Sequence, residues 1–174
     1  MNEVLTAIKE RSSIRAYKPQ MPEQEKLDAI INAGLQATTA NNKQEVHISV
    51  VKTDHPVIEE MATEFTQISA REGAFHYGAP VLVFLSADKV LKFAAVDAGI
   101  CVENMALAAQ SLGLSTVIIG CLWKQFESDK AAYYGEKLVC PENHVYQIAL
   151  ALGYKDTEKE PHEVDWNTHV TVVE

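Results

Sequence analysis

The spacing of hydrophobic residues along the chain predicts an alternation of helices and strands. Apolar residues three or four positions apart mark one face of a helix, whereas short apolar runs between turn residues mark strands. The predicted helices span residues 3–11, 23–36, 58–71, 89–112 and 124–134. The predicted strands span residues 47–51, 81–85, 116–120 and 145–152, and a short alternating pattern adds 169–173.

Two of these segments are expected at the centre of the molecule. Residues 81–85 are apolar on both faces, as expected of a strand that is covered on each side. The helix predicted over 89–112 is apolar nearly all round, which indicates a buried helix. Its alanines would let another helix approach closely, including one from a second subunit. Because helices and strands interleave, the pattern predicts an α/β or α+β sandwich around one mixed sheet.

Composition narrows the possible functions. No repeat, low-complexity tract or linker interrupts the 174 residues, so we expect a single domain over 1–174. A net charge of −9 and a pI near 5.1 argue against nucleic acid as the main partner. The chain has no membrane-length apolar run, no leader-like start and no metal-binding spacing among its histidines. With three widely spaced cysteines, Cys101, Cys121 and Cys140, it is typical of a cytoplasmic protein with reduced thiols.

A basic segment directly follows the first predicted helix. Arg11-Ser12-Ser13-Ile14-Arg15 contains two guanidinium groups and two hydroxyls, a set of donors that suits phosphate oxygens. The chain has neither the G-x-x-x-x-G-K-[ST] nor the G-x-G-x-x-G phosphate motif. We interpret the segment as an anion site of another kind. The alternative is a solvated turn with two incidental arginines.

Two further segments suit a flat, polar ligand. The stretch Thr38–Gln44 is rich in hydroxyls and amides, which match the hydrogen-bonding edge of a flavin ring. Its alternative interpretation is a turn between a helix and a strand. Ile118-Ile119-Gly120 ends a predicted strand, where ligands commonly meet α/β sheets and where glycine permits close approach. The plain alternative there is a strand terminus.

The first two of these three segments and four others, one of which contains Ile118–Gly120, occur in an order that resembles the FMN-dependent nitroreductase family in its short form. The others are Tyr77–Leu82, Asp97–Met105, Leu112–Gly120 and Ala149–Tyr154. The resemblance covers residues 3 to about 155. It implies an α+β fold, an α-β-α sandwich with a central mixed sheet. It also implies a homodimer with two FMN molecules at the interface, in which the C-terminal residues 154–174 wrap the partner and 169–173 form a strand.

The resemblance implies a role for each candidate site residue. The residues that would hold the ribityl phosphate are Arg11, Ser12 and Ser13, and the residue that would reach the N1/O2 side of the ring is Arg15. The loop residues that would reach a flavin bound mainly by the other subunit are Thr39, Asn42 and Gln44. The residues that would run alongside the ring, with a backbone N–H near N5, are Ile118, Ile119 and Gly120.

The sequence departs from the family pattern at two places. The polar loop of the family usually ends in Gln-Pro, whereas Gln44 is followed here by Glu45. Many relatives place a lysine or arginine after the last core strand to complete the phosphate clamp. Residues 155–174 hold two lysines and six acidic residues, a local charge of −4 with histidine neutral. The candidates that could complete the clamp are Lys155, Lys159 and His162.

The implied activity is FMN-dependent NAD(P)H oxidoreduction with ping-pong kinetics. Flavin N5 would pass a hydride from NAD(P)H to a nitroaromatic, a quinone or another flavin, so no catalytic side chain is required. Phe75, Tyr77 and Trp123 are candidate aromatic walls or, alternatively, core residues. Other interpretations stay open: a flavin carrier or sensor without turnover, a dehalogenase or dehydrogenase on the same scaffold, or a flavin-free interaction domain.

Overall fold

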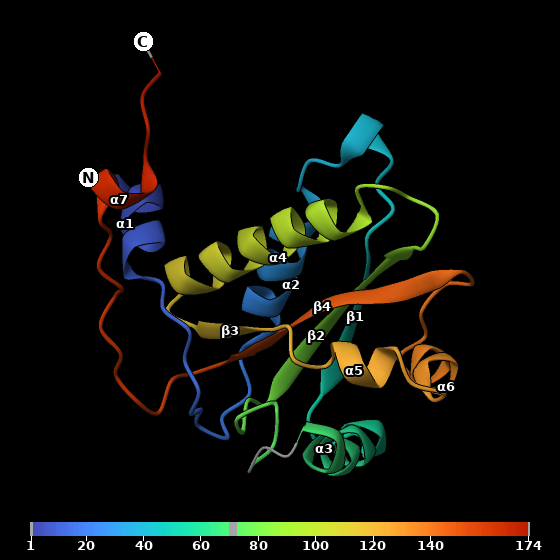
Figure 1. The fold of residues 1–174 in the computed structure, drawn as a ribbon. Coiled ribbons are helices and arrows are strands. Elements are labelled where there is room, and N and C mark those ends of the chain that lie inside the picture. The colour runs from blue at the N-terminus through green and yellow to red at the C-terminus, as the bar shows by residue number, and fades with distance from the viewer. Residues whose placement is uncertain (1, 70–72, 174) are drawn as a thin grey trace.

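A four-stranded sheet with helices on both faces forms the centre of the molecule (Figure 1). The structure, a computed structural model, describes residues 2–69 and 73–173. The strands are β1 (His47–Lys52), β2 (Val81–Asp88), β3 (Ser115–Ile119) and β4 (His144–Gly153), in the order β1-β2-β4-β3. The expected α+β sandwich is confirmed.

The helical segments lie close to the predicted ones, with short additions. They are α1 (Glu3–Glu10), α2 (Gln24–Leu35), η1 (Ala40–Asn42), α3 (Pro56–Ser69), α4 (Ala94–Ser111), α5 (Trp123–Phe126), α6 (Ala131–Lys137) and α7 (Trp166–His169). The predicted end of the third helix, residues 70–71, lies outside the described residues. None of the helices in the described part of the chain combines the length and apolar character that a membrane crossing requires.

The sheet is not mixed among its four strands. β1 pairs with β2, β2 with β4 and β3 with β4, each time antiparallel. Parallel pairing within the described chain is limited to one bridge, between Ser13 and Thr116. The prediction of a mixed sheet was wrong because a connection long enough to hold a helix can join strands of either direction.

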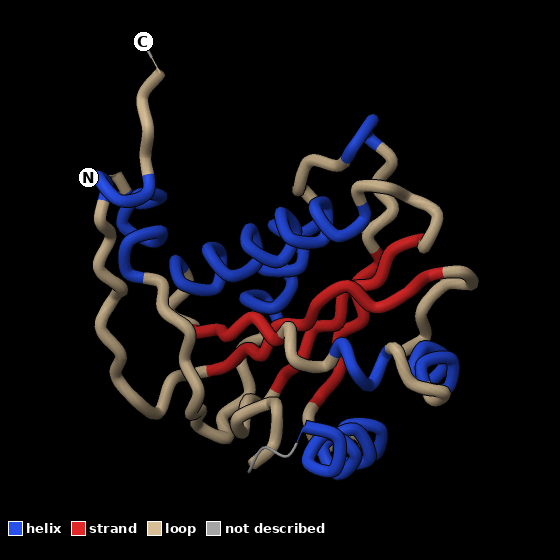
Figure 2. The backbone as a smooth tube through the Cα atoms, in the orientation of Figure 1, coloured by secondary structure: helices blue, strands red, loops and turns tan. Residues whose placement is uncertain are grey.

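β2 separates two hydrophobic cores. Successive side chains of a strand point to opposite faces, so Leu82 and Phe84 pack in one core while Val83 and Leu85 pack in the other. The first core includes apolar side chains of α3, and the second includes those of α2 and α4. Figure 2 shows these helices as two layers with the sheet between them. The predicted covered strand is confirmed.

The long predicted helix is shorter and less buried than its sequence suggests. It begins at Ala94, because Asp88 Oδ1 accepts the Val90 backbone N–H at 3.1 Å and holds a turn in front of it. One face of α4 also reaches solvent, where Val96 is 58% and Ile100 is 38% exposed. The prediction of a helix buried all round was therefore wrong for the single chain.

Two weaker predictions also differ from the structure. The helix predicted over 124–134 is split into α5 and α6 by Ser128, whose hydroxyl accepts the Lys130 backbone N–H at 3.2 Å. The strand predicted over 169–173 is wrong within this chain. Asp165 caps the short helix α7, which takes up His169, and the described residues beyond it pair with no strand.

α2 and α4 approach each other closely at Gly34. A Cβ at this position would lie 2.7 Å from Met105 Cγ and 3.2 Å from Cys101 Sγ, closer than real side chains pack. The predicted close approach of another helix to α4 is thus made by a glycine of the same chain. Burial raises the pKa of the Cys101 thiol to about 11, so this cysteine stays protonated and unreactive at neutral pH.

Candidate functional site

The basic segment lies along the open edge of β3. Ser13 pairs with Thr116 in a parallel bridge, and the Ile14 backbone N–H donates to Thr116 O at 3.0 Å. β3 is the last strand of the sheet, so its outer edge is available for this pairing. The bridge brings residues 11–15 beside the strand that leads to 118–120. Two of the three predicted groups of site residues therefore come together within one chain.

The segment that follows β4 runs along the other side of the basic segment. Tyr17 pairs with Lys155 in an antiparallel bridge, and the Ser12 hydroxyl donates to the Lys159 backbone carbonyl at 3.3 Å. Lys155 Nζ is engaged by Glu158 at 2.5 Å. Lys159 therefore lies next to the predicted phosphate site through its backbone, whereas the charge of Lys155 is paired within its own segment.

The two arginines have different surroundings. Arg11 Nε lies 3.5 Å from Glu103 Oε1 on α4, and its side chain is 20% exposed. Arg15 is exposed, and its guanidinium carbon lies 5.8 Å from the centre of the Tyr77 ring. Among the described residues no carboxylate forms an ion pair with Arg15. Arg15 is thus the arginine whose charge is available to a ligand, while Arg11 is held by α4.

A buried hydroxyl lies beside these donors. Thr116 Oγ1 is shielded from solvent and has no hydrogen-bond partner in the described part of the chain. Buried polar atoms are nearly always paired, and Thr116 lies opposite Ser13. The partly exposed serine hydroxyls and the guanidinium groups of residues 11–15 are donors of the kind that fit a phosphate carried on a polyol chain.

The polar loop has a strained backbone that presents its amides to solvent. Asn41 and Asn42 have φ of 54° and Gln44 has φ of 51°, all in the left-handed region. The Gln44 backbone N–H donates to Thr39 Oγ1 at 2.9 Å, and Gln44 Nε2 donates to Asn42 Oδ1 at 3.2 Å. Left-handed residues other than glycine tend to occur at functional sites. Asn42 and Gln44 are exposed, so they are available to another molecule.

This loop does not meet the basic segment within one chain. Figure 1 shows η1 and α1 at opposite ends of α4. The Ala40 backbone N–H donates to Asp97 Oδ2 at 2.9 Å, which fixes the loop to the first turn of α4. Thr39, Asn42 and Gln44 can therefore contribute to the site near Arg15 only if they come from a second chain.

Glu45, which departs from the family pattern, takes part in the same anchor. Burial and a hydrogen bond to Asp97 raise the pKa of the Glu45 carboxyl. Glu45 Oε2 is shielded from solvent, with no hydrogen-bond partner among the described residues. Burial and the nearby Asp97 carboxylate both disfavour the charged form of Glu45.

The strand end at 118–120 is open to a ligand only at its last residue. Ile119 is buried, Ile118 is half-buried and Gly120 is exposed. The Tyr146 hydroxyl donates to Ile119 O at 2.7 Å, so this carbonyl is already engaged. A Cβ on Gly120 would meet no other atom within 4 Å. Protein packing therefore does not require glycine here, and the backbone at Gly120 is accessible to a flat ring.

The three aromatic candidates have different roles. Phe75 is 1% exposed and packs in the core with Phe65, so the core-packing alternative is confirmed for it. Trp123 is exposed at the start of α5, which excludes core packing there. Tyr77 is half-buried, packs against the first hydrophobic core, and lies beside Arg15.

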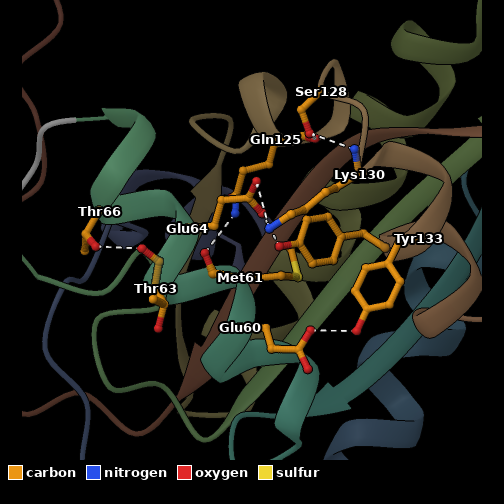
Figure 3. Close-up of polar contacts among 10 residues, drawn as sticks. Glu60, Met61, Thr63, Glu64, Thr66, Gln125, Ser128, Lys130 and Tyr133 are labelled. Carbon is orange, nitrogen blue, oxygen red and sulfur yellow. Dashed lines mark hydrogen bonds and ion pairs between the residues drawn. The ribbon is translucent and has the colours of Figure 1, made fainter.

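A second polar cluster joins α3 to α5 and α6 (Figure 3). Glu64 accepts a hydrogen bond from the Tyr134 hydroxyl and forms an ion pair with Lys130 at 3.5 Å. Gln125 Nε2 donates to the Met61 backbone carbonyl at 2.8 Å. Since each of these contacts joins α3 to the α5–α6 region, the cluster is a structural tie between helices.

Sequence reasoning missed two carboxylates on α4. Glu103 contacts Arg11, and Asp97 receives the loop, yet neither was a candidate. A signal was present, because they are the two acidic residues of a mostly apolar helix. Acidic side chains are rarely buried without a partner, so each position calls for a basic or hydrogen-bonding neighbour.

Known proteins share this fold. A nitroreductase with bound FMN from Desulfitobacterium hafniense has a TM-score of 0.91 to this chain, with 34% identity and full coverage of both chains. Another from Bacteroides fragilis, also with bound FMN, has a TM-score of 0.89, 30% identity and full coverage of both chains. An NADPH-flavin oxidoreductase from Vibrio harveyi is 31% identical over 175 residues, covering 92% of this chain and 69% of that protein. Residues 8–154 match the nitroreductase family, and the chain therefore belongs to that family.

Proposed function

We propose that this protein is an FMN-dependent NAD(P)H oxidoreductase that acts as a homodimer, with residues 1–174 as one FMN-binding domain. The observation that carries the proposal is the Ser13–Thr116 bridge, since it joins the donors of residues 11–15 to β3, the strand that leads to the exposed Gly120. The bound FMN of two solved relatives and the NADPH-flavin activity in the name of the Vibrio relative support it.

The phosphate end of FMN would be held by Arg11, Ser12 and Ser13. The ion pair of Arg11 with Glu103 uses Nε, so the two terminal nitrogens of the guanidinium remain for a forked contact with phosphate. Lys159 is our candidate for the further cation, because its backbone carbonyl already contacts Ser12. These contacts bind and orient the cofactor.

Arg15 would lie at the N1/O2 edge of the flavin ring. When bound, FMN supplies the hydride-transfer chemistry, and the protein sets its electrostatic environment. A fixed positive charge at this edge favours the reduced cofactor, and one charge-assisted hydrogen bond contributes about 1.5 to 3 kcal/mol. The chain Ile118–Gly120 would hold the ring at the strand end, and no side chain needs to act as an acid, base or nucleophile.

A second copy of the chain would complete each site. Thr39, Asn42 and Gln44 would extend from one subunit to the FMN held mainly by the other. The exposed apolar face of α4, at Val96 and Ile100, is of the kind that a subunit interface covers. Residues 154–174 would wrap the partner. The described residues after α7 are extended and exposed, so their backbone is free to contact a second subunit.

The acceptor would be a small molecule, a nitroaromatic, a quinone or a free flavin, which takes the place of the nicotinamide on the same ring face. A second candidate function is that of a flavin carrier or sensor without turnover. It is favoured by the acidic C-terminal segment, in which Glu158 pairs with Lys155 and so occupies a cation that could have completed the phosphate clamp. The two differ in whether NADH or NADPH reduces the bound flavin within seconds. A carrier would hold FMN and leave it oxidised.

Titration of the purified protein with FMN tests the proposal. We expect quenching of FMN fluorescence that saturates at one FMN per chain, and a dimer by light scattering. Addition of NADH or NADPH in the absence of oxygen should then bleach the flavin, and menadione or a nitroaromatic should restore it. A monomeric protein that takes up no FMN would contradict the proposal.

A further inference from the structure

The turn before β2 is held in an unusual backbone conformation. Tyr77 has φ of 54° and Gly78 has φ of 77°. Glycine adopts the left-handed region freely, but a residue with a side chain loses about 1 to 2 kcal/mol there. Such a residue persists only where its surroundings fix it. The position of the Tyr77 side chain is therefore imposed by the turn.

Hydrogen bonds within the turn provide this restraint. The Tyr77 backbone N–H donates to Ala74 O at 3.1 Å, and the Ala79 backbone N–H donates to His76 O at 2.9 Å. The Gly78 backbone N–H donates to His76 Nδ1 at 3.1 Å. Burial lowers the pKa of the His76 imidazole and so favours the neutral ring, whose Nδ1 can accept this bond.

Packing also fixes the turn relative to the basic segment. At Gly153 of β4, a Cβ would lie 2.7 Å from Pro80 Cδ and 3.2 Å from Tyr17 Cδ1. Pro80 follows the turn and Tyr17 follows Arg15, so both segments rest on the same glycine. The Tyr17 hydroxyl further donates to Ile14 O at 2.9 Å. The Tyr77 ring and the Arg15 backbone are thus held in one frame.

The Arg15 side chain meets the Tyr77 ring across this frame. Its guanidinium carbon lies 5.8 Å from the ring centre, within the range of cation–π attraction. Arg15 is exposed, and its long side chain has several rotamers to lose on ordering. A rigid ring beneath the guanidinium reduces that freedom before a ligand binds.

We propose that Tyr77 is a positioning residue for Arg15: its ring holds the guanidinium where it meets the N1/O2 edge of the flavin. This inference rests on the proposed function, in which Arg15 stabilises the reduced cofactor. Tyr77 itself contacts neither cofactor nor substrate in this role. Its effect is on the placement of a charge, and hence on the reduction potential of the bound flavin.

The test compares the midpoint potential of bound FMN in the wild type, Tyr77→Phe, Tyr77→Leu, Arg15→Ala and the double variant. We expect Tyr77→Phe to match the wild type, because it keeps the ring face. Tyr77→Leu should shift the potential to more negative values, as Arg15→Ala does, and slow flavin reduction by NADH about two- to fivefold, the range of an exposed cation–π contact. In the double variant, loss of Tyr77 should add nothing to the loss of Arg15.

The outcomes separate the two proposals. If Arg15→Ala shifts the potential and Tyr77→Leu does not, or if the two shifts simply add, the role of Tyr77 is rejected and the proposed function stands. If the wild type binds no FMN, the proposed function itself fails. Should Tyr77→Leu not fold, replacement of Tyr77 by pentafluorophenylalanine keeps the ring shape and removes its attraction for a cation. An unchanged potential in that protein would overturn the inference.

Discussion

Ser13 lies opposite Thr116 in a parallel bridge at the outer edge of β3. This pairing places the arginines and serines of residues 11–15 beside β3, the strand that leads to Gly120. On its other side the basic segment is bridged to the chain that follows β4, at Tyr17 and Lys155. The segment is therefore held between two parts of the chain that are far apart in the sequence.

Arg15→Ala should weaken FMN binding and make the potential of bound FMN more negative. The guanidinium is exposed and has no ion-pair partner among the described carboxylates. Its removal therefore takes away a positive charge that the bound FMN would contact. Loss of one charge-assisted bond corresponds to roughly a tenfold or greater rise in Kd. Fluorescence titration and redox titration measure both quantities. The matched control is Lys18→Ala, which removes an exposed cation three residues away. An equal effect of Lys18→Ala would mean that only the net positive charge of the region matters, and not the position of Arg15.

Asn42→Gly should loosen FMN only in the context of a dimer. Glycine tolerates the left-handed backbone at this position (φ of 54°), so the substitution removes the amide without adding strain. Asn41→Gly, with the same φ, is the control. Mixing Asn42→Gly chains with Arg15→Ala chains should yield heterodimers with one intact site. FMN affinity that does not recover in the mixture would argue against a loop shared between subunits.

Glu45→Gln should flatten the dependence of stability on pH above the usual range of a glutamate. The pKa of Glu45 is raised in the folded protein, by burial and by Asp97. Its contribution to stability is therefore complete below the unfolded-state pKa and is lost as pH rises through the folded-state value. Thermal unfolding across this pH range measures the effect. Glu127→Gln, at an exposed position, should reproduce the wild-type curve. If the Glu45→Gln curve also ran parallel to the wild-type curve, the raised pKa of Glu45 would be contradicted.

Tyr134→Phe should destabilise the fold more than Tyr133→Phe. The Tyr134 side chain is 1% exposed and donates to Glu64, whereas Tyr133 is 39% exposed and donates to Glu60 at 2.7 Å. Figure 3 shows the Tyr133 contact beside the buried cluster. A buried hydrogen bond to a charged group contributes roughly 1.5 to 3 kcal/mol. Urea unfolding compares the variants, and equal midpoints would contradict the structural role of the cluster.

Gly153→Ala should destabilise the protein by about 1 to 3 kcal/mol, the usual range for overpacking. The new methyl would press on Pro80, whose ring cannot rotate away, and on Tyr17. Gly135→Ala is the control, because a Cβ there meets nothing within 4 Å and α6 would gain a better helix former. A neutral Gly153→Ala would mean that Pro80 and Tyr17 can separate without loss.

Local patterns predicted the elements well, and long-range relations poorly. The covered strand β2 and the helix α2 follow directly from apolar spacing. Strand direction does not follow from apolar spacing. All four strands pair antiparallel because of the route that the connecting segments take between them. The start of α4 was missed because a single side chain, Asp88, holds the preceding turn.

The candidate site was predictable in its parts and not in its assembly. The residue types in 11–15 indicate an anion site, but only the bridge to Thr116 shows which strand they meet. An acidic residue in a mostly apolar helix indicates that Glu103 and Asp97 have partners, but these partners lie more than fifty residues away, and no local pattern identifies them. The separation of η1 from α1 follows from their attachment to α4 at different points, and it makes a second chain necessary for the proposed site.

The most direct test of the central proposal is the visible spectrum of the protein after loading with FMN, before and after NADH or NADPH is added without oxygen. We predict a yellow protein with one FMN per chain, whose flavin absorption disappears within seconds and returns when an acceptor is supplied. A protein that stays colourless in the presence of FMN, or whose bound flavin is unchanged by both nicotinamides, would contradict it.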